Sequence, residues 1–122
     1  ILRQAKENGT GFIAFSPLAQ GLLTNRYLNG IPDDSRIAKG GFLKKEALTD
    51  EVLKKIKALN ELAIRRGQTL AEMALAWILK DDLVTSVIIG ASSVGQLADN
   101  LKAIDNTAFS AEELKNIYQI VK

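Results

Sequence analysis

The pattern of hydrophobic positions divides the chain into short apolar runs and longer amphipathic stretches. Two runs, at residues 11–15 and 86–89, are rich in Phe and β-branched residues and too short for a helix core, so they predict strands. Apolar residues recur at helical spacing elsewhere. The predicted helical segments are the tail at 1–8, a short turn at 18–23, and longer helices at 49–66, 69–80, 94–104 and 111–121.

Local signals mark where several of these helices begin. Thr49 precedes one amphipathic stretch as a potential N-cap. Thr69 with Glu72, and Ser110 with Glu113, each match the capping-box pattern of a hydroxyl residue followed three positions later by Glu. The resulting order of strand, helices, strand and helices predicts an α/β fold with parallel βα units.

Composition narrows the class of protein. The chain has 122 residues and 16 Lys plus Arg against 14 Asp plus Glu, for a formal net charge of +2. Its main basic clusters, at 54–57 and 65–66, lie on a helical pattern and predict a solvated face, not a nucleic-acid surface. No apolar run is long enough for a membrane span and no signal peptide is visible. We therefore expect a cytoplasmic protein without nucleic-acid or membrane partners.

The absence of two residue types excludes several chemistries. The sequence contains no Cys and no His. This excludes disulfides, thiol catalysis, the usual zinc sites and a histidine base within this chain.

Each predicted strand runs into a turn that leaves the backbone open to a ligand. Pro17 ends the first strand and favours extended backbone at Ser16. The second strand leads into small residues beginning at Gly90, and Ser93 with Gln96 then matches the S-x-x-Q capping box. A helix start behind such a turn suits a phosphate, and a dinucleotide is the natural ligand. Neither turn has the Rossmann or P-loop glycine pattern.

These two turns resemble segments of the aldo-keto reductases. F-S-P-L-A-Q-G-L-L-T at 15–24 is similar to the segment after the seventh barrel strand, and I-I-G-A-S-S-V-G-Q-L-A-D-N at 88–100 to the adenosine-phosphate motif after the eighth. Residues 28–36 and 77–82 resemble the branch of bacterial glyceraldehyde 3-phosphate reductases and potassium-channel β-subunits.

The resemblance implies a fold for the whole chain. We expect residues 1–122 to be the C-terminal portion of a single (β/α)8 TIM-barrel domain, with two parallel strands, flanking helices and no internal boundary. A closed barrel needs at least ~200 residues, so the chain would be a fragment. Ser16 and Ser92 should then lie at the same end of the strand pair.

The resemblance also implies NADPH as cofactor and reduction of an aldehyde or ketone as activity. In the family, the positions that match Ser92 and Gln96 contact the adenosine phosphate. The position that matches Asn100 contacts the adenine, and the position that matches Arg26 pairs with the phosphates. The loop at 25–45 would act as a lid over the cofactor. The implied cofactor-binding residues are Ser16, Leu18, Gln20, Gly21, Arg26, Gly90, Ser92, Ser93, Gln96 and Asn100.

Catalytic groups are not expected in this chain. The family uses an Asp, a Tyr, a Lys and a His on earlier strands and loops, and no residue here matches them. The expected partners are thus the upstream half of the same barrel, a small carbonyl substrate and a second copy of the protein. Two alternatives stay open: a regulatory NADPH-binding module like the potassium-channel β-subunits, and a fragment that is inactive by itself.

Overall fold

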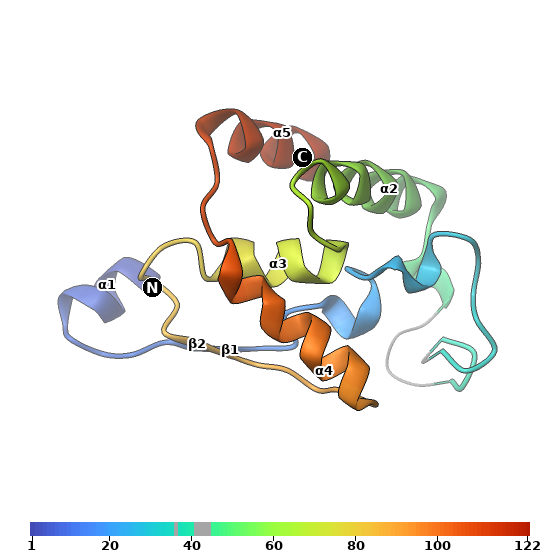
Figure 1. The fold of residues 1–122 in the computed structure, drawn as a ribbon, viewed down its shortest axis with the longest axis horizontal. Helices are drawn as coiled ribbons and strands as arrows, with labels where there is room; N and C mark the ends of the chain where they lie inside the picture. Colours follow the sequence, from blue (N-terminus) through green and yellow to red (C-terminus); the bar gives the residue numbers. More distant parts are fainter. Residues whose placement is uncertain (36, 41–44) are drawn as a thin grey trace.

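The chain folds as two βα segments whose strands pair with each other (Figure 1). The structure, a computed structural model, describes residues 1–35, 37–40 and 45–122. The helices and strands are α1 (Leu2–Glu7), β1 (Ile13–Phe15), α2 (Asp50–Arg65), α3 (Leu70–Ile78), β2 (Ser86–Ile88), α4 (Val94–Leu101) and α5 (Ala111–Val121). Shorter 3₁₀ turns lie at Ala19–Gly21, Asn25–Tyr27, Lys45–Ala47 and Lys102–Asp105.

β1 and β2 run parallel, as predicted. Ile13 lies opposite Ser86 and Phe15 opposite Ile88. Both strands are shorter than the sequence predicts. Just before β1, the Phe12 N–H donates to the Thr85 hydroxyl at 2.9 Å. This N–H therefore bonds a side chain and not a backbone carbonyl of the neighbouring strand.

The two faces of the strand pair differ in burial. Ile13, Phe15 and Ile88 are 60%, 79% and 60% exposed, while Ala14 and Val87 point to the opposite face and are half-buried. The apolar run at 86–89 is typical of a buried strand, but Ile88 has no cover on this face of the pair. Figure 1 shows the reason, since α2, α3 and α5 all lie on one side of the strands.

The core lies among the helices. Ile56, Leu59 and Leu62 of α2 pack with Leu70 and Met73 of α3. Ile117 of α5 also belongs to the cluster, and the half-buried Trp77 packs against it. Local caps fix where these helices begin: Thr49 accepts from the Val52 N–H, and the capping boxes predicted at Thr69 and Ser110 are both formed. These caps account for the agreement between predicted and observed helix starts.

Two helices end earlier than predicted. α3 stops at Ile78, not at residue 80. α4 stops at Leu101, where the Lys102 N–H donates to Asp99 O three residues back. Such an i→i+3 bond tightens the backbone, and the segment continues as the 3₁₀ turn Lys102–Asp105.

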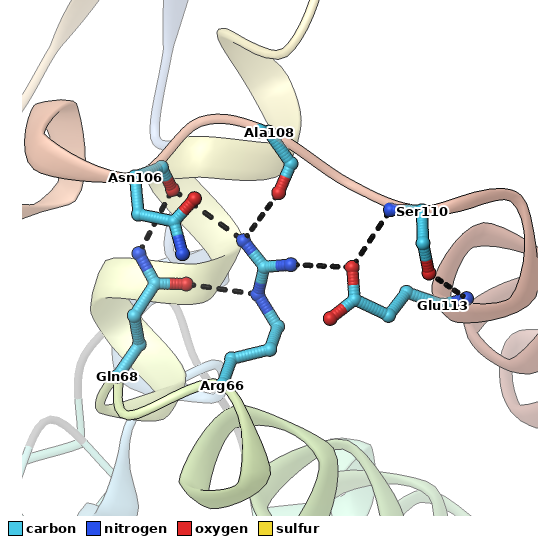
Figure 2. A network of polar contacts seen from close by, with 6 residues as sticks. All are labelled: Arg66, Gln68, Asn106, Ala108, Ser110 and Glu113. Carbon is cyan, nitrogen blue, oxygen red and sulfur yellow. Dashed lines mark hydrogen bonds and ion pairs between the residues drawn. The ribbon is translucent and has the colours of Figure 1, made fainter.

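Arg66 departs from the expected solvated face. Its side chain is only 3% exposed, and its Nη1 lies 2.7 Å from Glu113 Oε2. Figure 2 shows the guanidinium at the centre of a network that also includes the Gln68 carboxamide and two backbone carbonyls, those of Asn106 and Ala108. The Phe109 ring also lies 3.7 Å from the guanidinium carbon. Arg66 therefore joins the end of α2 to the start of α5.

The described residues of the loop predicted at 25–45 are irregular apart from the 3₁₀ turns. Tyr27 and Ser35 are buried at 1% and 0% exposure, so this part of the loop is packed against the chain. The predicted lid also includes residue 36 and residues 41–44, which lie outside the described residues. Within the described ranges, no helix has the length and hydrophobicity needed to cross a membrane.

Candidate functional site at the carboxyl ends of the two strands

The two turns singled out from the sequence open at one edge of the strand pair. β1 ends at Phe15 and β2 at Ile88, and these two residues lie opposite each other in the parallel register. Ser16 follows β1 directly, and the turn that contains Ser92 follows β2. The prediction that both turns share one end is confirmed, because parallel strands place their carboxyl ends together.

The turn after β1 has a strained backbone. Ser16, Ala19 and Gln20 have φ values of 53°, 47° and 58°, which lie in the left-handed region. Gly21 follows with a φ of 101°. Each such non-glycine residue costs about 1–3 kcal/mol, and such residues gather at functional sites. The expected extended geometry of Ser16 is wrong, since the chain turns at once and the Ala19 N–H donates to Ser16 O at 3.1 Å.

Hydrogen bonds within this turn hold the strained shape. The Gly21 and Leu23 N–H groups both donate to Leu18 O, at 2.9 and 3.2 Å. The Thr24 hydroxyl donates to Gly21 O at 2.7 Å. Leu18 and Gln20 are also half-buried. These hydrogen bonds join the predicted residues of the turn into one local unit.

Arg26 follows the turn and has a partner of its own. Its Nη2 lies 2.6 Å from Asp34 Oδ2 and 3.5 Å from Asp34 O. The Asp34 side chain is 72% exposed. Arg26 therefore follows the end of β1 closely in sequence, but its guanidinium is already paired with the Asp34 carboxylate.

The turn after β2 leads into α4, where the predicted capping box is only half formed. The Ser93 hydroxyl accepts from the Gln96 N–H at 3.1 Å, as predicted. The Gln96 side chain does not return to the Ser93 backbone. Its Oε1 accepts from the Ser92 N–H at 2.7 Å and from the Ser92 hydroxyl at 3.0 Å. The reciprocal bond is thus shifted by one residue along the chain.

The start of α4 has a different charge from the starts of α2, α3 and α5. Those three helices carry acidic residues in their first turns, whereas the first turn of α4 has none. The first N–H groups of a helix have no intrahelical acceptor. A Cβ added at Gly90 or Gly95 would meet no atom within 4 Å, so the approach to this helix start is open.

Asn100 lies one turn further along α4 than Gln96, on the same face. It is 5% exposed, and its Nδ2 finds no acceptor among the described residues. Beside it, Asp99 bonds Lys102 at 3.1 Å, and this hydrogen bond raises the pKa of Lys102 above 10.5. The structure therefore places Gln96 and Asn100 on one face of α4, with Ser92 in the turn just before the helix, but it buries the Asn100 amide.

A cavity of about 560 Å³ is lined by no residue of β1, of β2 or of the turns that directly follow them. It is lined by Asn25, Leu28 and Asn29 and by residues of α2, of α3 and of the connection between these two helices. None of the ten predicted cofactor residues lines it. In the part of the chain that the structure describes, no group of acidic residues could hold a metal ion.

Comparisons with known proteins match most or all of the chain. The model of the Aldo/keto reductase family matches residues 1–122. L-glyceraldehyde 3-phosphate reductase of Escherichia coli (strain K12) is 52% identical over 123 residues, which cover 98% of this chain and 36% of the relative. A probable voltage-gated potassium channel subunit beta of Arabidopsis thaliana is 43% identical over 101 residues, or 80% of this chain and 31% of the relative.

A solved structure shares the fold. The glycerol dehydrogenase of Gluconobacter oxydans superposes with a TM-score of 0.77 at 24% identity, covering 99% of this chain and 37% of that one. The chain thus has the α/β fold of the corresponding part of a (β/α)8 barrel, with two parallel strands and flanking helices. It spans about a third of the length of the curated relatives it matches. The family match over every residue confirms the resemblance of the two strand-end turns, and the chain belongs to the aldo/keto reductase family.

Proposed function

We propose that the protein containing this chain is an NADPH-dependent reductase of aldehydes or ketones, and that this chain holds the adenosine and pyrophosphate half of the cofactor. The observation that carries the proposal is the meeting of two unusual turns at one edge of the strand pair. One turn is strained at three non-glycine residues, and the other opens onto a helix without acidic residues in its first turn. Phosphate sites of barrel enzymes commonly follow the last two strands.

The donors at this edge fit an anionic cofactor. A helix start stabilises a negative charge by about 0.3–1 kcal/mol at the surface, and its free N–H groups suit phosphate oxygens. When bound, the cofactor supplies the hydride that reduces the carbonyl carbon. For the pyrophosphate and ribose we propose Ser16, Leu18, Gln20, Gly21 and Arg26. For the adenosine phosphate and adenine we propose Gly90, Ser92, Ser93, Gln96 and Asn100.

Two of these assignments need a local rearrangement. Arg26 reaches a phosphate only by leaving Asp34, which it now bonds at 2.6 Å. Asn100 reaches an adenine only when the atoms that cover its Nδ2 move, since that atom is buried. We propose that cofactor binding supplies the interactions that replace these contacts.

We place the proton donor for the forming alkoxide outside this chain. The groups that shape the carbonyl pocket would come from the upstream part of the same barrel, so that part is the first proposed partner. A second copy of the protein is a further candidate partner. We propose a cytoplasmic location, where NADPH is available.

The test is cofactor binding and turnover by the complete protein. NADPH binding is followed by fluorescence quenching, and NADPH oxidation by absorbance with L-glyceraldehyde 3-phosphate as the first substrate, because a relative with 52% identity carries that name. We expect Gln96→Ala to weaken NADPH binding about ten- to a hundredfold, the loss of one hydrogen bond to a charged group. The matched control is Gln119→Ala, at an exposed glutamine of α5. Equal affinities of the two variants would remove Gln96 from the proposed site.

The second candidate function is a regulatory module like the potassium-channel β-subunits. It is favoured by the 43% identity with the Arabidopsis thaliana relative over 80% of this chain. Such a module would bind NADPH tightly but turn over slowly, and would bind a channel partner. Steady oxidation of NADPH with aldehydes, measured without any channel partner, would favour the reductase over the regulatory module.

A third possibility concerns the chain by itself. We propose that residues 1–122 alone do not oxidise NADPH with any aldehyde, because the proton donor is absent. Expression of these residues and a turnover assay test this. Activity that survives removal of any longer contaminant would show that the catalytic groups are misplaced in this proposal.

A further inference from the structure

Asparagine is followed directly by glycine at two exposed places in this chain, Asn8–Gly9 and Asn29–Gly30. Asparagine is a chemically labile residue, and its carboxamide carbon can be attacked by the backbone nitrogen of the next residue. Glycine hinders this approach least, because it has no Cβ. A Cβ added at Gly9 or Gly30 would meet no described atom within 4 Å, so the packing around neither glycine blocks the reaction.

The end of α1 holds the backbone at Asn8. The Gly9 N–H donates to Lys6 O at 3.0 Å, and the next N–H, that of Thr10, donates to Ala5 O at 2.8 Å. These are the distances of well-formed backbone hydrogen bonds. Ring closure at Asn8 would require the Gly9 nitrogen to lose its proton and to turn away from Lys6 O. The helix end therefore protects the Asn8 side chain.

The backbone at Asn29 lacks this support. The Gly30 N–H lies 3.5 Å from Tyr27 O, beyond the usual range of about 2.7–3.2 Å for an N–H···O bond. The Leu28 N–H is also long, at 3.4 Å from Asn25 O. Because Gly30 is exposed and weakly bonded, its nitrogen can lose a proton to solvent and approach the Asn29 carboxamide with little structural cost.

We propose that Asn29 is a site of spontaneous deamidation in the folded protein. The deprotonated Gly30 nitrogen attacks Asn29 Cγ and forms a new C–N bond. The bond from Cγ to Nδ2 then breaks, and ammonia leaves with a proton taken from water. The product is a cyclic succinimide, which adds water at either of its carbonyl carbons. Addition at Cγ gives aspartate, and addition at the backbone carbonyl carbon gives isoaspartate, in which the main chain continues through the side chain.

The reaction places a new carboxylate in a polar part of the molecule. Asn29 lines the cavity of about 560 Å³ together with Glu72, which is only 8% exposed. The new charge thus enters a cavity that already contains a carboxylate, and like charges repel there more strongly than in bulk water. The modified chain is also more acidic than the original, so ion-exchange chromatography separates the two forms.

Peptide mapping by mass spectrometry tests the proposal on the complete protein after timed incubation. We expect Asn29 to convert at least about tenfold faster than Asn8, because well-formed hydrogen bonds must first open at Asn8. The conversion should accelerate as the pH rises, since the attacking nitrogen must lose its proton. Both aspartate and isoaspartate should appear at position 29. In urea, where α1 is unfolded, the two asparagines should convert at similar rates.

Two variants identify the source of the acidic form. Asn29→Gln lengthens the side chain and disfavours ring closure, so the acidic form should no longer accumulate. Asn8→Gln is the matched control and should leave its accumulation unchanged. The proposal is overturned if Asn29 stays intact in the folded protein while it converts in urea, or if Asn8 converts as fast as Asn29 without urea. Formation of aspartate without isoaspartate would overturn the succinimide step, because it would indicate direct hydrolysis.

Discussion

Arg66 Nη1 lies 2.7 Å from Glu113 Oε2, and this pair joins the C-terminus of α2 to the N-terminus of α5 (Figure 2). The same carboxylate oxygen accepts from the Ser110 N–H at 2.8 Å and so completes a capping box. Burial is the largest influence on Glu113 and opposes its ionisation. The bonds from Ser110 and Arg66 together outweigh burial and hold the pKa of Glu113 below 4.5.

This lowered pKa predicts a loss of stability in acid. Because the folded-state pKa lies below the ordinary value, the stabilisation is fully present above pH 4.5 and is lost as the pH falls through the folded-state pKa. We expect Glu113→Gln to lower the free energy of unfolding by about 1–3 kcal/mol at neutral pH. The deficit should shrink in acid, as followed by urea unfolding at a series of pH values.

The neighbouring residue supplies the control. Glu112 lies in the same first turn of α5 and is exposed. Glu112→Gln should change stability by less than about 0.5 kcal/mol at any of these pH values. A deficit for Glu113→Gln that stays constant into acid would show that ionisation of Glu113 is not the source.

The strain after β1 predicts an unusual response to glycine. Ala19 has a φ of 47°, which glycine adopts without steric strain, so Ala19→Gly should raise the free energy of unfolding by up to about 1 kcal/mol. Gly21→Ala should lower it by about 1 kcal/mol or more. A Cβ at Gly21 would lie 3.7 Å from Tyr27 Cε2, an ordinary contact, so the backbone alone causes that loss. A destabilising Ala19→Gly would contradict the strain.

The Arg26–Asp34 pair predicts a gain in cofactor affinity when the carboxylate is removed. Asp34→Asn leaves the Arg26 guanidinium free of a competing charge, so we expect about two- to fivefold tighter NADPH binding, with the difference shrinking at high salt. Stability should change by less than about 1 kcal/mol, since the pair is largely exposed. Asp33→Asn is the matched control. Equal effects of the two variants would indicate a general charge effect without a role for Arg26.

Asn100 predicts opposite changes in stability and binding. Asn100→Leu removes a buried amide whose Nδ2 has no acceptor among the described residues, so the free energy of unfolding should stay equal or rise. NADPH binding should weaken about fivefold, because the proposed adenine contact is lost. Asn116→Leu, at a half-buried position of α5, should leave NADPH binding unchanged. Unaltered binding in Asn100→Leu would place the adenine elsewhere.

The sequence by itself determined the elements whose signals are local. The boxes at Thr69 and Ser110 place the starts of α3 and α5 correctly, because each involves residues only three positions apart. The parallel pairing of β1 with β2 follows from the βα order and the family resemblance. The two strand-end turns could be placed at one edge for the same reason.

Only the tertiary structure decided features that depend on residues distant in sequence. The helical pattern predicts a solvated Arg66. Glu113 lies 47 positions away in sequence, and the fold brings the two side chains together. Ser16 was expected to be extended before Pro17, but closure of the turn places it in the left-handed region. Gln96 fits a box with Ser93, yet the path of the turn after β2 brings the Ser92 N–H to its oxygen. Local patterns fix where an element starts, whereas burial, backbone strain and the direction of a donor depend on what the folded chain places beside it.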